Sequence, residues 1–293
     1  MIKIYKRMIA LMFAATAVIT VILPFVGDLS GVLAEPKLTP QEFLDLRPYS
    51  TLQNGMIIIE PSSSLLVFAL AIIAFVIGIL FLVKHKNQIS RRLWGWGMIF
   101  WGISAASAGI SYQCFGYELK ARGQEYVLYT SWFEIIYMIL AFASIAFLLA
   151  AEGYVVYKDN NRRMKLNLFC TAYTLFYTLI MCAGVFTRSR TLMSYNVFLI
   201  FNIVTFAILF SLAVIHYIKY KDKTNRNMII IGVGMVIVNI LYFVYLFAGT
   251  GQMLWDRFNI YFTSNDVLHV ALIVWMLLQA VLLYKPLADA ESK

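Results

Sequence analysis

Residues 62–83 read SSSLLVFALAIIAFVIGILFLV, and this stretch decides the fold. It contains no charged residue. It is also long enough to cross the ~30 Å hydrocarbon layer of a bilayer, which takes about 20 helical residues. Backbone amides in lipid have no water to bond, so such a run is helical unless it belongs to a closed barrel. Barrel strands are only about 10 residues long and alternate in polarity, unlike this stretch. The sequence therefore predicts a transmembrane helix here.

Similar runs recur along the whole chain. The composition agrees, because 61% of the residues are hydrophobic and only 13% are charged, against roughly 25% charged in soluble domains. We predict an all-α, polytopic membrane protein with a seven-helix transmembrane core and one additional amino-terminal helix. The predicted spans are 8–26, 62–83, 93–116, 127–151, 166–186, 192–218, 228–249 and 266–284.

The basic residues indicate how the chain lies in the membrane. The formal net charge is +9, which invites a nucleic-acid partner, but the distribution of Lys and Arg favours another explanation. Most of the 24 fall on one side of the predicted spans, as expected from the positive-inside rule. We therefore expect no nucleic-acid partner, a multi-pass protein of the cell (inner) membrane, and cytoplasmic amino and carboxyl termini. The basic segments are 3–7, 84–92, 158–165, 219–226 and 285–293.

Four segments follow from this pattern. Residues 1–34 form a signal peptide or a retained anchor helix, since Val32 and Ala34 resemble small-residue cleavage positions but the apolar stretch is long for a cleaved signal. Residues 35–60 are an external loop or short amphipathic segment. Residues 61–286 hold the seven transmembrane helices, and 287–293 are a cytoplasmic tail.

Ionisable residues inside predicted spans are candidate functional residues, because a charge within a membrane is costly unless it is paired or hydrated. They fall at the ends of three predicted spans that reach the outer face, so we expect one outward-facing polar pocket. On the last span, Asn265 and Asp266 lie four and three residues before His269, and share a helix face with it. The predicted pocket residues are Gln113, Tyr117, Glu118, Glu134, Asn265, Asp266 and His269.

Structural roles remain open for each of these residues. Asp266 and Asn265 can cap a helix amino terminus, where backbone donors lack partners. His269 can be a packed histidine bonded to an acid, and Glu134 can belong to a purely structural network. Two ligand classes are disfavoured. A retinal Schiff base needs a lysine midway along the last helix, and haem ligation needs paired histidines at matching depth.

These motifs resemble a known family. The segment AGISYQCFGYEL (108–119), an acid early in the third core helix, and FTSNDVLHVAL (262–272) resemble the CREST superfamily of alkaline ceramidases and progestin and adipoQ receptors, in particular its uncharacterised prokaryotic branch. The pair Glu60 and Pro61 at the first core helix is similar too. The resemblance implies a seven-helix fold. For active members it implies zinc held by one histidine of the second helix and two of the seventh, with an acid that activates water for amide hydrolysis.

The chain departs from that zinc pattern. Gln113 stands where the second-helix histidine is expected, and Ser264 or Asn265 stands where the first histidine of the seventh helix is expected. Only His269 remains, with Asp266 beside it. A hydrolytic zinc site needs about three protein ligands and one open position, so we expect a degenerate metal site rather than a competent one.

Three functional interpretations follow. The leading one is an outward-facing polar pocket that binds a lipid, senses it or serves as a scaffold for partner membrane proteins, with no cofactor. The second is a zinc-dependent lipid amide hydrolase, with His269 and Asp266 as metal ligands, Glu134 as general base, and Glu134 and Asp266 as the catalytic residues. The third is a small-solute transporter or an accessory subunit of a membrane complex, suggested by Asn202 and Asn239 in mid-helix.

Overall fold

The computed structural model describes residues 2–291. Most of these residues are helical and only two three-residue strands are present among them, which confirms the predicted all-α class. The elements in chain order are α1 (Ile2–Val26), α2 (Pro40–Asp45), β1 (Tyr49–Thr51), β2 (Ile57–Ile59), α3 (Pro61–Val83), α4 (Ile89–Ala108), the π-helix η1 (Gly109–Cys114), α5 (Gly116–Lys120), α6 (Trp132–Val156), α7 (Asn160–Phe186), α8 (Tyr195–Tyr220), α9 (Lys223–Phe247), α10 (Thr250–Phe258) and α11 (Ser264–Leu283).

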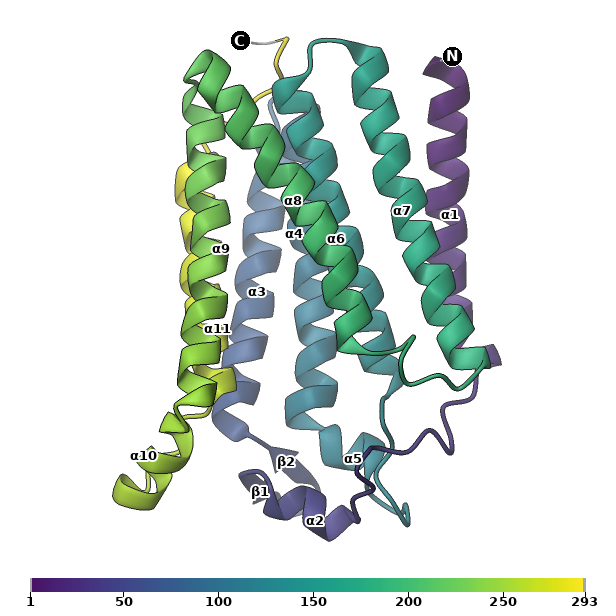
Figure 1. The fold of residues 1–293 in the computed structure, drawn as a ribbon, viewed down its shortest axis with the longest axis vertical. Helices are drawn as coiled ribbons and strands as arrows, with labels where there is room; N and C mark the ends of the chain where they lie inside the picture. The colour runs from purple at the N-terminus through teal and green to yellow at the C-terminus, as the bar shows by residue number, and fades with distance from the viewer. Residues whose placement is uncertain (1, 292–293) are drawn as a thin grey trace.

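Within residues 2–291, seven helices are long and apolar enough to cross a membrane, namely α1, α3, α6, α7, α8, α9 and α11. The chain is therefore a multi-pass membrane protein. The long helices stand side by side, and both ends of the bundle carry connections (Figure 1). One end of the bundle, here called the basic end, holds the start of α1, the end of α11, and the connections α3–α4, α6–α7 and α8–α9 (Figure 1). At the opposite end, here called the loop end, lie α2, the strands, α5 and α10.

The remaining predicted run, 93–116, forms α4 and η1, which pack against α3 and α6. Small residues make this packing close. A Cβ at Gly95 would lie 3.0 Å from the carbonyl oxygen of Gly78 in α3, and one at Gly97 would lie 2.7 Å from Leu148 in α6. Ser144 of α6 also donates a hydrogen bond to the carbonyl oxygen of Gly97 (2.7 Å). Glycines and serines at helix contacts are typical of membrane bundles, and they lower the hydropathy of α4 relative to its neighbours.

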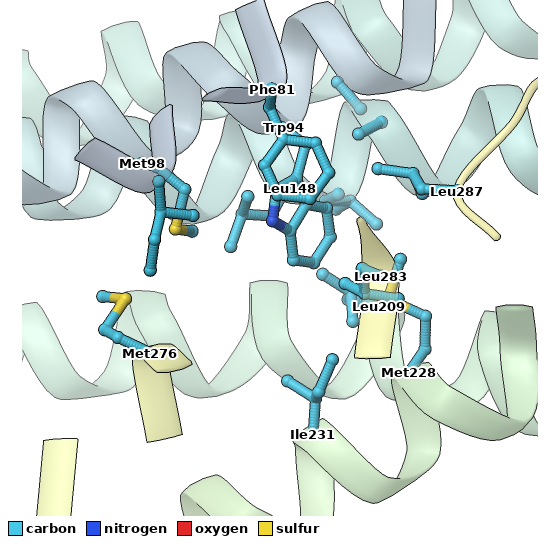
Figure 2. Close-up of a cluster of buried hydrophobic side chains, with 14 of the residues drawn as sticks. Phe81, Trp94, Met98, Leu148, Leu209, Met228, Ile231, Met276, Leu283 and Leu287 are labelled. Atoms are coloured by element: carbon cyan, nitrogen blue, oxygen red, sulfur yellow. The ribbon is translucent and has the colours of Figure 1, made fainter. Parts of the chain in front are cut away.

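A large apolar cluster fills the half of the bundle nearer the basic end. Figure 2 shows Trp94 at its centre, with Met98 of the same helix and Met276 of α11 nearby. Leu148, Leu209 and Ile231 bring α6, α8 and α9 into the same cluster (Figure 2). Because the side chains of this cluster come from seven helices, with α3 and α7 also contributing, the cluster fixes the helices that carry polar residues at the loop end.

The loop end contains more regular structure than the sequence predicts. Segment 35–60, expected to be a loop or short amphipathic segment, forms α2 and the antiparallel pair β1–β2, in which Tyr49 faces Ile59. Thr39 and Glu42 form a capping box at the start of α2. The segment after α1 pairs with the chain before α6, because Ala34 N–H donates to the carbonyl oxygen of Val127 (2.9 Å).

The carboxyl-terminal segment 284–291 packs against the basic end. The Asp289 carboxylate accepts hydrogen bonds from the backbone N–H groups of Ile89 (2.9 Å) and Ser90 (2.8 Å) in the first turn of α4. Glu291 pairs with Arg163 of α7 at 2.7 Å. Leu287 between them is buried. The described part of the predicted tail is therefore an integral part of the fold.

Candidate functional site

The amino termini of α3 and α11 meet at the loop end and bring two carboxylates together. Thr263 is the N-cap of α11 and forms a capping box with Asp266, whose Oδ2 accepts a hydrogen bond from Thr263 N–H (2.6 Å). The other oxygen of Asp266 accepts from Ser63 Oγ of α3 (2.9 Å). Asn265 Nδ2 donates to Glu60 Oε2 (2.8 Å). We call these five residues the α3–α11 acid cluster.

Of the two acids in this cluster, Glu60 is the less stabilised. It lies at the N-cap of α3 with a left-handed backbone, φ 43°, which is rare for a residue other than glycine. It is buried, and its Oε1 lies 3.9 Å from Nη1 of Arg47, which is beyond hydrogen-bond distance. Burial raises the pKa of the Glu60 carboxyl, and the nearby Asp266 carboxylate adds to that rise. The cluster therefore holds two buried carboxylates opposite one distant, partly exposed cation.

His269 lies one turn further along α11. Its side chain is 6% exposed and close enough to Asp266 for an electrostatic interaction. Its Nδ1 has no hydrogen-bond partner within the protein. Whether Nδ1 carries a proton depends on the tautomer, but in either case one polar atom next to the acid cluster is unsatisfied. A buried polar atom of this kind can be satisfied by a ligand, an ion or a water molecule.

Gln113 presents a similar unsatisfied atom on the opposite helix. It lies in η1, a single π-helical stretch that continues α4, and its buried Oε1 has no partner. A π-helical turn holds more residues than an α-helical one, so it re-aims the side chains that follow it. The neighbouring residue Cys114 approaches Ser64 of α3. Gln113 thus sits at the same end of the bundle as the acid cluster, although no hydrogen bond joins them.

Glu134 belongs to a second, separate cluster. It is buried in the first turn of α6, and Lys120 Nζ donates to its Oε1 at 2.6 Å. Ser111 of η1 donates to the same oxygen (2.8 Å), and Thr130 donates to Oε2 (3.1 Å). Every oxygen of this carboxylate is therefore engaged, and a charge of opposite sign compensates it. Glu134 is held by a lysine, not by His269 or Asp266.

The other two predicted pocket residues, Tyr117 and Glu118, lie in the short helix α5. Glu118 accepts a hydrogen bond from Ile57 N–H of β2 (2.8 Å) and pairs with Arg122 at 3.0 Å. Tyr117 packs against the small apolar cluster that includes Phe43 and Ile59. The structure therefore brings Asn265, Asp266 and His269 together and holds Glu134, Glu118 and Tyr117 elsewhere at the loop end.

Sequence reasoning missed several residues of these clusters, Ser111, Thr130 and Thr263 among them. Ser63 and Lys120 received no functional role, and Glu60 entered only through its resemblance to a family motif. Lys120 lies six residues beyond Cys114 in a segment that was assigned to the outer loop, yet it is 6% exposed. The available signal for the pair with Glu134 was the position of Lys120, two residues after Glu118 and close in sequence to Glu134.

The residues present do not fit a hydrolytic zinc ion. Within residues 2–291, no group of three or more His, Cys, Asp and Glu residues could hold a metal. Both oxygens of Asp266 are used by Ser63 and Thr263. Glu134 is neutralised by Lys120, which also removes it as a general base. His269 thus lacks the further ligands that zinc requires.

No protein-family model matches the chain, and comparisons with curated proteins and with solved structures find no match either. The resemblance to the CREST superfamily stays a prediction. Function is therefore inferred from the residues themselves.

Proposed function

We propose that this protein binds a membrane lipid at its loop end, through the α3–α11 acid cluster and His269. One observation carries the proposal. His269 Nδ1 is a buried polar atom without a partner in the protein, beside two buried carboxylates, of which Glu60 faces Arg47 at 3.9 Å. A sensing or scaffolding role that depends on the bound lipid agrees with this arrangement.

The chemistry of the cluster favours a lipid with a primary ammonium group. An ammonium has three donors and one positive charge, so it can donate to Glu60 and to neighbouring oxygens while it compensates their charge. A buried acid pair with an incomplete set of cations is costly, and a bound ammonium would lower that cost. Phosphatidylethanolamine carries such a group. The choline of phosphatidylcholine carries a similar charge but has no N–H to donate.

The positive-inside pattern supports a cytoplasmic basic end, because the basic connections and the described part of the carboxyl-terminal segment lie there. The loop end then faces the outside of the cell membrane. The acid cluster would take its lipid from the outer leaflet.

The other two interpretations receive less support. The hydrolase needs a metal for which the donor set is unsuited, as described above. Transport needs a polar path across the bundle, whereas each mid-helix asparagine donates its amide N–H within its own helix and only Asn202 Oδ1, of the two asparagine oxygens, is a buried atom without a partner in the described residues. Asn202 Nδ2 donates to the carbonyl oxygen of Phe198 (2.7 Å), and Asn239, which is exposed, donates to that of Met235 (2.8 Å).

Native mass spectrometry of the delipidated protein tests the proposal. The probes are phosphatidylethanolamine and phosphatidylcholine with the same palmitoyl and oleoyl chains. We expect preferential retention of phosphatidylethanolamine by the wild type. Glu60→Gln and His269→Ala should each lower that retention at least about tenfold, the change expected when one charged hydrogen bond worth about 1.5–3 kcal/mol is lost.

Matched variants make the test specific. Glu125→Gln removes an exposed acid from the same end of the bundle, and His85→Ala removes a histidine from the basic end. Both should retain phosphatidylethanolamine as the wild type does. Equal retention of the two lipids by the wild type, unchanged by Glu60→Gln, would refute the ammonium site.

A further inference from the structure

The short helix α10, Thr250–Phe258, is distinctly two-sided. It follows α9 after Gly249, which has a left-handed backbone (φ 61°), and ends at Asn259. Gln252 and Asp256 lie on one face and are joined by a hydrogen bond (2.8 Å). At 100° per residue, Leu254 and Phe258 lie on the opposite side of the helix, and Trp255 lies at the edge of that side, about 60° from Gln252. None of the residues of α10 is buried.

The apolar face of α10 is highly exposed. Phe258 is 62% exposed and Trp255 is 43% exposed. Figure 1 shows α10 bending away from the end of α9 and projecting beyond the side of the bundle. In the described part of the chain, it contacts mainly α9. Exposing several neighbouring large apolar side chains to water is unfavourable. Something outside the bundle must therefore cover this face.

The surface of α9 shows what covers it. Val244 and Phe247, in the last turn of α9, are 61% and 80% exposed, and they belong to a helix that is apolar enough to span a membrane. Lipid covers that surface. Because Trp255 and Phe258 follow after a short turn, their exposed face continues a surface already assigned to the bilayer. A nine-residue helix also offers too little area for a standard protein interface.

The depth of α10 follows from the length of α9. The 25 residues of α9 span about 37 Å at 1.5 Å per residue, more than the ~30 Å hydrocarbon layer. The end of α9 at Phe247 therefore reaches the head-group layer. Tryptophan and tyrosine are enriched at that depth, and the Trp255 ring lies 4.8 Å from that of Tyr261.

We propose that α10 is an interfacial helix that lies flat on the bilayer at the loop end, with Leu254 and Phe258 toward the acyl chains, Trp255 at the edge of that side, and Gln252 and Asp256 toward water. This is the arrangement of short amphipathic helices in membrane interfaces. Arg257 is then placed near lipid phosphates.

The position of α10 bears on the neighbouring acid cluster. The hydroxyl of Tyr245 in α9 donates to the carbonyl oxygen of Phe262 (2.6 Å), directly before the N-cap Thr263 of α11. Tyr261 lies close enough to Glu60 for an electrostatic interaction. A membrane-bound α10 therefore holds the acid cluster at head-group depth. The inference itself does not depend on which lipid the cluster binds.

Site-directed spin labelling tests the inference on the full chain. In a background with Cys114, Cys170 and Cys182 replaced by Ala, single cysteines Phe258→Cys and Gln252→Cys are labelled and the protein is placed in phosphatidylcholine vesicles. Collision with apolar oxygen and with a polar nickel chelate is then measured. The label at 258 should favour oxygen by severalfold, and the label at 252 on the same helix should favour the nickel chelate.

Leu254→Cys provides a second position on the apolar face if Phe258→Cys does not fold, and it should behave like position 258. Two outcomes would overturn the inference. If the labels at 252 and 258 both collide freely with the nickel chelate, α10 lies in water. If the label at 258 is shielded from both reagents, a protein surface covers the apolar face.

Discussion

The buried pair between Lys120 and Glu134 offers the sharpest test of how the loop end is held together. The two side chains are 8% and 4% exposed, and their charged atoms lie 2.6 Å apart. Removing one partner of a buried pair leaves an uncompensated charge and costs about 3–5 kcal/mol, whereas removing both costs much less. We expect Lys120→Met and Glu134→Gln each to lower the free energy of unfolding by about 3–5 kcal/mol.

The double variant decides whether the two residues act as a pair. If they do, Lys120→Met with Glu134→Gln should be no less stable than either single variant. The coupling energy from the double-mutant cycle should then be about 2 kcal/mol or more. Unfolding in mixed detergent and SDS micelles, followed by tryptophan fluorescence, measures all four proteins.

A surface pair provides the control. Arg162 and Asp159 lie 3.8 Å apart and are 71% and 56% exposed, so Arg162→Met should cost no more than about 1 kcal/mol. If Lys120→Met costs as little as Arg162→Met, or if the coupling is close to zero, Glu134 is not held by Lys120. Glu134 would then become available again as a reactive group.

Two further predictions concern the acids at opposite ends of the bundle. Burial and Asp266 raise the pKa of the Glu60 carboxyl above its ordinary 4.5, so the native state binds the carboxyl proton more tightly than the unfolded chain does. The free energy of unfolding should therefore fall as pH rises from the ordinary pKa through the raised native pKa. Glu60→Gln should remove this slope in SDS titrations at several pH values, whereas Glu125→Gln should leave it unchanged; an unaltered slope in Glu60→Gln contradicts the assignment. Asp289→Ala should cost about 0.5–2 kcal/mol, as loss of a helix cap does, because it leaves the first N–H groups of α4 unsatisfied; a change within error in the same titration would show that water replaces the carboxylate.

Hydropathy predicted the helices well, but it placed the start of some of them several residues too late. The run 166–186 lies within α7, which begins six residues earlier at Asn160. Its N-cap is Asp159, whose side chain accepts a hydrogen bond from Asn161 N–H. Asp222 similarly starts α9 at Lys223, before the predicted 228. Capping residues set these boundaries, because a helix can extend beyond the lipid into water.

Short elements at the loop end were missed for a different reason. Helix α10 has no apolar run, because its apolar residues occupy only one face of a nine-residue helix. The strands β1 and β2 have three residues each, too few for a pattern to be recognised. Such elements depend on the longer helices around them, and their own residues carry little signal.

The candidate site was predictable only along one helix. Spacing alone placed Asn265, Asp266 and His269 on one side of α11, since residues three and four apart are neighbours. The bond from Ser63 to Asp266 joins residues 203 positions apart, and its prediction requires knowing that α3 packs against α11. Lys120 meets Glu134 only because the turn between α5 and α6 brings them together. No periodicity within one helix contains that information.

The packed segment 284–291 has a practical consequence for anyone who expresses this protein. A fusion partner joined close after Glu291 would lie beside the ion pair between Glu291 and Arg163. A bulky reporter or affinity tag there would pull directly on the contacts that close the first turn of α4. Reporter assays of membrane orientation should therefore insert a flexible glycine and serine linker. Poor yield of a direct fusion would reflect this strain and would say nothing about which side of the membrane the terminus occupies.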